Sequence, residues 1–289
     1  MFKHYNKFSP YLFLLPALLV LLVFFFIPFF QTIGLSFFDY TTSIYKPTFC
    51  VLDNYVKIFH NNVFYTVMLN TFIYLIVAVP VLVVLPLFVA ILINQKIRGI
   101  TLYKILIYLP VIVSIVVAAI AFKWLYAEHG ILNYILEFFH LSSIGWLTDP
   151  KYAIYSVILV TVWKGIGYYM MIYLAALMSV PNELYEACDI DGANFWQKHL
   201  TVTVPHLMPT IALVSTISAI SAMKIFAEIY VMTKGGPLNS TKTIVYYIYE
   251  KAFENLDLGL ASAMAVVLLL IVIVFSVINI FCFEKKKYF

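Results

Sequence analysis

Residues 66–93 read TVMLNTFIYLIVAVPVLVVLPLFVAILI, a run of 28 residues without one charged side chain. The hydrocarbon core of a bilayer is about 30 Å thick, and a helix that rises about 1.5 Å per residue crosses it in about 20 residues. Lipid offers no partner to backbone N–H and C=O groups, so a stretch that crosses it has to satisfy these groups internally. The sequence therefore predicts a membrane-spanning helix here.

The composition of the whole chain agrees with a membrane environment. Of its 289 residues, 64% are hydrophobic and only 11% are charged. A soluble domain carries about 25% charged residues, so this chain cannot cover a water-facing surface, and a soluble enzyme is excluded. The net charge of +4 is small. The basic residues gather near predicted membrane edges, which indicates membrane topology rather than nucleic-acid binding.

Six stretches are long and apolar enough to cross a bilayer. We expect an all-α polytopic membrane protein, in which a short N-terminal segment of residues 1–10 precedes a single transmembrane domain of residues 11–289. The first apolar run is too long for a cleaved signal peptide. Prolines inside several spans, such as Pro110, permit kinks. The six predicted spans are 11–37, 66–93, 102–126, 153–178, 207–231 and 258–283.

The charges around these spans predict their orientation. Six spans place both termini on one side, and that side carries nine basic residues, mostly in short segments. The other side carries seven basic residues in longer loops, together with eight acidic residues. Short cytoplasmic segments are enriched in lysine and arginine, so we expect both termini in the cytoplasm. The nine basic residues are Lys3, Lys7, Lys96, Arg98, Lys104, Lys198, Lys285, Lys286 and Lys287.

The most polar segment on the inner side is residues 179–209, between the fourth and fifth spans. Pro181 suits the first turn of a helix, where a missing N–H costs little. Glu183 and Glu186 complement the positive end of that helix. Gly192 allows the left-handed residue that ends a helix. The pattern predicts a helix, a glycine turn and a second short helix outside the membrane.

The second helix is expected to begin at Ala193 or Asn194 and to run to about Thr201. It carries Phe195 and Trp196 on one side. Aromatic side chains on a short helix outside lipid need a surface against which to pack. We therefore expect this helix pair to have a partner; an interfacial helix pair that lies on lipid is the alternative.

The segment resembles the EAA loop of permease subunits from binding-protein-dependent ABC importers. That pattern is Glu-Ala-Ala, three residues, Gly, nine residues and Ile-x-Leu-Pro. This chain has Glu186-Ala187-Cys188, then Gly192, then Val202, Val204 and Pro205 at the same offsets, with three conservative departures. The resemblance extends over nearly the whole chain and is strongest to the carbohydrate-uptake branch. Outlying matches include Asn54, Tyr55, Asn70, Thr71, Asn133, Phe226, Tyr230, Thr233, Gly235, Gly236, Pro237 and Thr241.

The resemblance implies a function and a set of partners. The chain would be a permease subunit that passes a sugar or related polyol from an extracellular or periplasmic solute-binding protein into the cytoplasm, across a bacterial plasma membrane. It would pair with a second, homologous permease subunit and two ATPase subunits. The loop would couple ATP binding on the partner to movement of the spans. The implied coupling residues are Glu186, Ala187, Asp191, Gly192, Ala193, Phe195 and Trp196.

Ionisable groups inside spans are costly and often functional. Trp163, Lys164 and Tyr168 in the fourth span are candidates for the translocation pathway, since aromatic faces stack on sugars. A lysine that reaches to the outer interface is the alternative for Lys164. Lys224 and Glu228 in the fifth span are four residues apart on one helix face and can pair. They are either a structural or gating ion pair or further pathway contacts.

Other functions are also considered. A secondary transporter or channel for small polar solutes would show carboxylates at the membrane midplane or an internal repeat, and neither is clear in the sequence. A membrane-embedded enzyme would need a nucleophile with its base, or a metal site, and no such group of residues is recognised. We expect a transport subunit that is not an enzyme and holds no cofactor or metal, with ATP bound by a partner.

Overall fold

The computed structural model describes residues 9–40, 47–95 and 98–284, and most of this part of the chain is helical. The predicted segment 1–10 lies almost wholly outside the described residues. Six lysines used to predict the orientation also lie outside the described residues. They are Lys3, Lys7, Lys96, Lys285, Lys286 and Lys287.

The chain divides into two compact units, the first formed by Met1–Asn61 and Ile248–Leu269. Its only strands among the described residues are two short ones, which pair antiparallel with Phe38 opposite Phe49. The helices and strands are α1 (Ser9–Leu21), η1 (Leu22–Phe26, a π-helical turn), α2 (Ile27–Leu35), β1 (Phe38–Asp39), β2 (Thr48–Phe49), α3 (Asp53–Phe59), η3 (Glu250–Glu254, also π-helical) and the beginning of α15 (Leu258–Glu284).

Asn54 holds the first unit together at the start of α3. Its side chain is 1% exposed, and its Nδ2 donates to the carbonyl oxygens of Ser36 and Phe38, each at 2.9 Å. The neighbouring Tyr55 hydroxyl lies 2.8 Å from Ser36 Oγ. Gly259 of α15 allows close approach here, because an added Cβ would lie 2.0 Å from Phe38 O. A buried amide that satisfies two turn carbonyls explains why this asparagine follows the first span.

The second unit is formed by Asn62–Tyr247 and Leu270–Phe289. It contains the remaining helices and the end of α15. They are α4 (Asn62–Ile93), α5 (Ile100–Ile112), α6 (Ile115–Leu125), α7 (Ile131–Phe138), α8 (Ala153–Leu177), α9 (Asn182–Ile190), α10 (Phe195–Lys198), η2 (His199–Thr203, π-helical), α11 (Val204–His206), α12 (Met208–Met223), α13 (Ala227–Met232) and most of α14 (Ile244–Tyr249).

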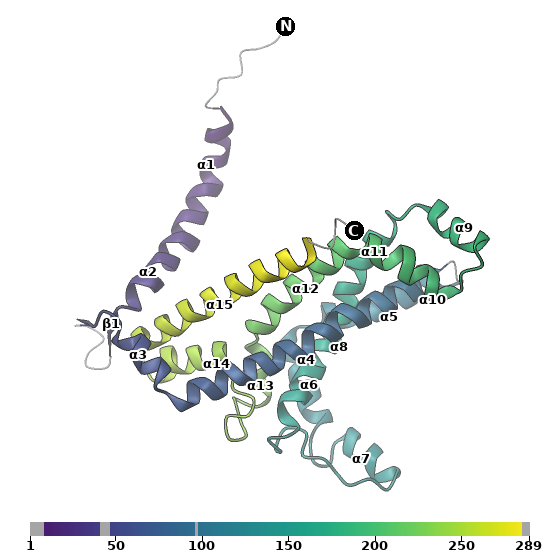
Figure 1. Cartoon of the computed structure of the whole chain (residues 1–289). Coiled ribbons are helices and arrows are strands. Elements are labelled where there is room, and N and C mark those ends of the chain that lie inside the picture. Colours follow the sequence, from purple (N-terminus) through teal and green to yellow (C-terminus); the bar gives the residue numbers. More distant parts are fainter. Residues whose placement is uncertain (1–8, 41–46, 96–97, 285–289) are drawn as a thin grey trace. The chain divides into compact units, whose positions relative to one another are not determined.

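Helix α8 is central to the second unit. It packs against α4 and α5, α4 also packs against α12, and α6 packs against α13 (Figure 1). Residues at the centres of these contacts, such as Tyr74 of α4, Val157 of α8 and Val214 of α12, have no exposed surface. In lipid the helices gain little from hiding apolar surface, so close packing and interhelical hydrogen bonds hold them together.

Five helical stretches are long and apolar enough to cross a membrane, and a bent helix pair makes up to six. The five are Tyr11–Leu35, Asn62–Ile93, Ala153–Leu177, Met208–Met232 and Leu258–Asn279. They overlap the predicted first, second, fourth, fifth and sixth spans. The helical class and these five candidates are confirmed, while the count of six crossings stays a prediction.

The third predicted span, 102–126, is not one continuous helix. It consists of α5 and α6, which are bent by 95° at a break. Val113 between them is extended, with φ −64° and ψ 132°, and Ser114 caps α6 in a similar conformation. Pro110 has no N–H to donate and weakens the last turn of α5, so a break close behind it has a physical reason. The bend is much sharper than a proline kink alone.

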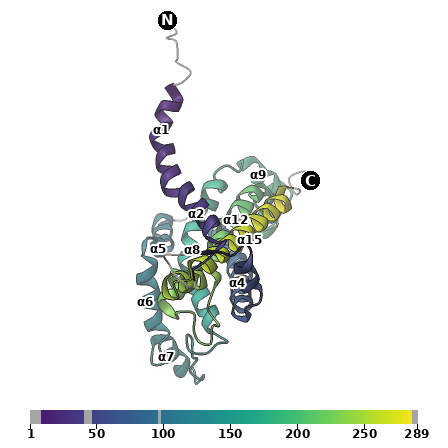
Figure 2. The ribbon, with the colours of Figure 1, turned by 90° about the vertical axis from the view of Figure 1, so that its left-hand side faces the viewer.

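The predicted coupling loop and the segment around α7 lie at opposite ends of the second unit. Figures 1 and 2, which are turned by 90° from one another, both place α9 at one end and α7 at the other. Helix α8 runs between these ends.

Candidate functional site

The predicted helix–glycine–helix segment is present between α8 and α12, and we call residues 179–209 the coupling loop. Its first helix, α9, begins after Pro181. It ends in a pair of bonds in which Gly192 N–H donates to Asp189 O at 3.1 Å and Ala193 N–H donates to Cys188 O at 2.9 Å. Gly192 has φ +74°, a conformation that strongly favours glycine. The predicted glycine turn is confirmed.

The second helix begins at a capping box. Asn194 Oδ1 accepts from the backbone N–H of Gln197 at 3.0 Å, and Gln197 Oε1 accepts from Asn194 N–H at 2.8 Å. Two backbone donors at the helix start are thereby satisfied. The prediction that this helix ends near Thr201 is wrong. The helix continues as η2 and α11 up to His206. Pro205 stands near the start of α11 and has no N–H to donate to the preceding turn, η2.

Hydrogen bonds and rings join the two helices of the coupling loop. The buried Thr203 Oγ1 lies 2.8 Å from Tyr185 OH and 2.8 Å from His199 Nδ1. Lys198 forms an ion pair with Asp189. Burial lowers the pKa of His199, and the Lys198 ammonium adds to this effect. Side-chain contacts therefore join the two helices of the loop to one another.

The coupling residues proposed from the sequence lie on the surface of this unit. Glu186, Ala187 and Asp191 are exposed. The ring of Phe195 packs edge-on against His199 at 4.4 Å between centroids. Trp196 stacks on Phe88 of α4 at 5.9 Å, although 57% of it is exposed. Ala193 is half-buried. The loop also exposes apolar side chains at Leu184, Ile190 and Leu200.

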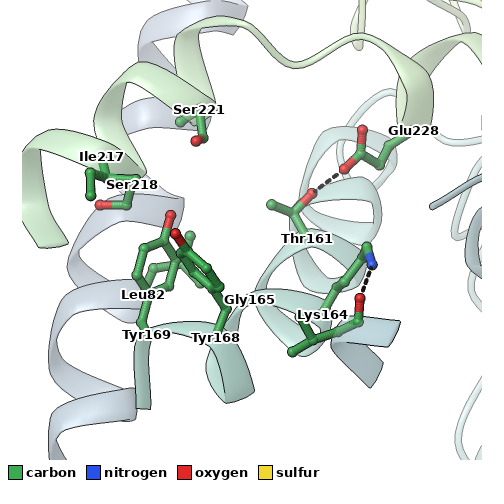
Figure 3. A pocket seen from close by; sticks show the side chains of 12 residues that line it. Leu82, Thr161, Lys164, Gly165, Tyr168, Tyr169, Ile217, Ser218, Ser221 and Glu228 are labelled. Atoms are coloured by element: carbon green, nitrogen blue, oxygen red, sulfur yellow. Dashed lines mark hydrogen bonds between the residues drawn. The ribbon is translucent and has the colours of Figure 1, made fainter. Parts of the chain in front are cut away.

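A cavity of about 340 Å³ opens between α4, α5, α8, α12 and α13 (Figure 3). This volume is in the range of about 300–1,000 Å³ that small-molecule sites have. Tyr168 and Tyr169 stand on the side of Ser218, whereas Thr161 and Lys164 stand on the side of Glu228. The lining is Leu82, Val111, Thr161, Lys164, Gly165, Tyr168, Tyr169, Ile217, Ser218, Ser221, Ala222 and Glu228.

Glu228 is held in this cavity by a hydroxyl chain. Its side chain is 7% exposed, and Oε1 accepts from Thr161 Oγ1 at 3.2 Å. Thr161 Oγ1 is in turn 2.5 Å from the hydroxyl of Tyr74, which is fully buried. A buried carboxyl group is stabilised when its oxygens accept hydrogen bonds. The arrangement offers polar contacts to a solute along one wall.

The predicted pair of Lys224 and Glu228 is not formed. Helix α12 ends at Met223, Lys224 is the capping residue behind it, and α13 begins only at Ala227. The two side chains thus do not share a helix face; Lys224 is exposed and Glu228 is buried. The described residues contain no ion pair between them. The spacing of four residues is misleading because the helix is interrupted between them.

The structure divides the other pathway candidates. Lys164 and Tyr168 line the cavity, but Trp163 does not. Trp163 instead packs edge-on against Phe122 of α6, with 5.1 Å between centroids. Lys164 does not reach toward the end of the span, since its ammonium bonds backbone carbonyls of the α5–α6 break.

Sequence reasoning missed several polar residues of the cavity. Thr161 was missed, although it lies three residues before the predicted candidate Lys164 on the same face of α8. Ser218 and Ser221 are similarly spaced in α12. This helical spacing of hydroxyl groups in apolar runs was the available signal. Tyr74 could not be found in that way, because it reaches the site from a different helix.

Known proteins resemble this chain in sequence over nearly its whole length. Residues 55–281 match the family model described as "Binding-protein-dependent transport system inner membrane component". A probable ABC transporter permease protein, YurN of Bacillus subtilis, is 35% identical over 98% of both chains. The arabinooligosaccharides transport system permease protein AraP of Halalkalibacterium halodurans is 36% identical over 97% of this chain and 89% of its own length.

A solved structure shares the fold. It is a chain of the bacterial alginate ABC transporter in complex with alginate pentasaccharide-bound periplasmic protein. The TM-score is 0.81 at 25% sequence identity, and the match covers 96% of this chain and 94% of the other. The expected resemblance to carbohydrate-uptake permeases is confirmed by these relatives. Their names describe transport components, which agrees with a permease subunit and not with an enzyme.

Proposed function

Because the chain belongs to the family of binding-protein-dependent transport system inner membrane components, we propose that it is the permease subunit of an ATP-driven importer for a sugar or related polyol. It is a multi-pass membrane protein of the permease fold. The observation that carries the coupling part of the proposal is the coupling loop, a rigid and exposed helix pair at one end of the spans. The ABC transporter permeases among its relatives favour this proposal over a secondary transporter or channel.

The sugar class is supported by the relatives and by the chemistry of the cavity. The relatives carry arabinooligosaccharides in one case and alginate in another. In this chain the cavity presents hydroxyl groups of Thr161, Tyr168 and Ser221, together with the carboxyl group of Glu228. Sugar hydroxyls both donate and accept hydrogen bonds, and sugar C–H faces pack on aromatic rings. We assign the contacts with the solute to these residues.

We assign the coupling loop to the surface of an ATPase subunit. Glu186 would be the polar anchor and Gly192 the turn, while Ala187 and Ala193 allow close approach. Phe195 and Trp196 would give apolar contact beside Asp191. The energy has to come from this partner, because the chain itself holds no nucleotide site that its sequence reveals. A second permease would complete the pathway, and a solute-binding protein would deliver the sugar on the outer side.

Two substitutions test the coupling role. Glu186→Lys reverses an exposed charge, and Gly192→Pro forbids φ +74° and removes the N–H that bonds Asp189 O. Both variants are expected to insert into the membrane but to abolish uptake of radiolabelled maltose and arabinooligosaccharide by cells that express the complete importer. The matched control is Glu137→Lys, which reverses the charge of another exposed glutamate, on α7. Normal uptake by both coupling variants would refute the assignment.

The orientation of the chain is tested with its own cysteines. Cys50 follows the first span and Cys188 lies in the coupling loop, and both side chains are partly exposed. We propose that both termini are cytoplasmic, so these thiols lie on opposite sides of the bilayer. In variants that keep one cysteine, a membrane-impermeant maleimide added to intact spheroplasts should label Cys50 and spare Cys188. Labelling of Cys188 from outside would invert the orientation and exclude an ATPase contact.

A further inference from the structure

Lys164 is a charged side chain in the middle of α8 that has no acidic partner within ion-pair distance among the described residues. Its Nζ donates instead to three backbone carbonyls, those of Val113 at 2.6 Å, Val111 at 3.0 Å and Pro110 at 3.5 Å. An ammonium group has three N–H donors and no acceptor. All three donors are thus directed to the chain itself.

These carbonyls are available because α5 breaks at this point. The last four C=O groups of a helix have no partner inside the helix. Here the chain leaves the helix at Val113 and turns by 95° into α6. In a membrane-embedded region, a carbonyl without a hydrogen-bond partner is costly, because lipid cannot supply one. The C-terminal end of a helix also attracts a cation. Lys164 supplies both the hydrogen bonds and the charge.

Helix α8 lies close enough to α5 for the Lys164 side chain to reach the break between α5 and α6. One turn after Lys164, Gly167 faces the backbone of α5. A Cβ at Gly167 would lie 2.4 Å from Ile107 O and 2.9 Å from Tyr108 Cα. Lys164 and Gly167 are three residues apart and share a face of α8. Gly167 allows α8 to approach α5, and the long side chain of Lys164 reaches the break.

We propose that Lys164 is a positioning residue, which holds the third span in its broken form and thereby shapes the cavity. Val111, whose carbonyl accepts from Lys164, is also part of the cavity wall. The importance of the cavity shape for import rests on the proposed function. The stabilisation of the α5–α6 break by Lys164 does not. A direct bond from Lys164 to a solute is a weaker explanation, because each N–H donor already has an acceptor.

The bend can be measured as a distance between spin labels. Leu102 of α5 is 59% exposed and Trp124 of α6 is 77% exposed, so both accept a label at the surface. If residues 102–124 formed one straight helix, 22 steps of about 1.5 Å would separate them by about 33 Å. Two arms of about 15 Å at nearly a right angle give about 20 Å. Label linkers add to both values but do not remove the difference.

The experiment uses the full chain in nanodiscs, with Leu102→Cys and Trp124→Cys in a background in which Cys50, Cys188 and Cys282 are serine. Lys164→Met, which keeps length but has no donors, is expected to shift the mean distance by several ångströms toward the straight value or to broaden it into two populations. Lys164→Arg, which keeps the donors, should retain the short distance. Lys123→Met is the matched control, an exposed lysine on α6 itself.

The same variants are then compared in uptake assays. Lys164→Met should lower the maximal uptake rate at least tenfold and leave KM within about twofold, because cavity shape changes while solute contacts stay. An unchanged, narrow distance distribution in Lys164→Met overturns the proposal, and so does a raised KM without a change in distance. If Lys164→Met does not accumulate, Lys164→Gln, which is too short to reach all three carbonyls, takes its place with the same expected shift. The distance measurement needs neither solute nor ATPase, so its result tests the role of Lys164 separately from the proposed function.

Discussion

Replacing Gly167 by alanine should force α5 and α8 apart. The added Cβ would lie 2.4 Å from Ile107 O and 2.9 Å from Tyr108 Cα, and both neighbours are backbone atoms that cannot turn away. An ordinary contact of a carbon atom is about 3.5 Å or more. Helix α5 therefore has to move by about 1 Å at this point. Such a shift also moves the carbonyls to which Lys164 donates.

The size of the effect follows from two opposing contributions. Overpacking of a close contact costs about 1–3 kcal/mol. Alanine in place of glycine stabilises a helix by up to about 1 kcal/mol. If alanine gains the full amount of about 1 kcal/mol, the net effect of Gly167→Ala is a loss of stability of up to about 2 kcal/mol. At roughly 2–4 °C for each kcal/mol, the midpoint of thermal unfolding should fall by a few degrees.

Gly165→Ala is the matched control, because it adds the same methyl group two residues earlier on the same helix. Its Cβ would lie 2.6 Å from Leu82 Cδ2, the end of a leucine side chain that can change rotamer, and 3.5 Å from Tyr169 Cε2, which is an ordinary contact. Thermal unfolding of the purified complex, followed by tryptophan fluorescence, is the assay. We expect Gly167→Ala to unfold at a lower temperature than Gly165→Ala. Equal midpoints for the two variants, with equal uptake, would refute the close approach of α5 and α8.

Three further predictions concern single side chains. The buried Asn133 bonds three carbonyls and accepts from the indole N–H of Trp146 at 3.0 Å; Asn133→Ala should therefore cost about 2 kcal/mol or more, seen as faster protease cleavage between residues 127 and 146. Because burial lowers the pKa of His199 below its ordinary 6.5, the folded loop binds this proton less readily than the unfolded loop, so its contribution to stability is complete above pH 6.5 and is lost as the pH falls below it. In His199→Gln the unfolding midpoint should lose that part of its pH dependence, and an unchanged profile would contradict it. Tyr168→Ala removes an exposed ring of the cavity and should raise the uptake KM several-fold, whereas an unaltered KM would remove Tyr168 from the pathway.

Local signals in the sequence were sufficient for the two helices of the coupling loop and the glycine turn between them, although not for the end of the second helix. Pro181, Gly192 and Asn194 act on the residues beside them, through a fixed φ, a left-handed turn and a cap. Their effects can therefore be read without knowledge of the fold. The apolar runs similarly reveal where helices can cross a membrane, because length and composition are local properties.

The break in the third span could not be read in this way. Hydropathy does not distinguish one helix from two helices that meet at Val113, since the residues on both sides are equally apolar. The carbonyls at the break are satisfied by Lys164, which is more than 50 residues away in sequence. The gap between α12 and α13 had the same effect on Lys224 and Glu228. Interruptions that depend on a distant helix are not visible in helical spacing.

The central claim, that the coupling loop meets an ATPase, is tested most directly by site-specific photo-crosslinking. Ile190 at the end of α9 is 87% exposed, and Leu238 in the loop before α14 is 89% exposed. A benzophenone amino acid is placed at one position or the other in the complete importer and irradiated in membranes. We predict that the label at Ile190 forms an adduct with the ATPase subunit, identified by mass spectrometry, and that the label at Leu238 does not. An adduct from Leu238, or none from Ile190, would contradict it.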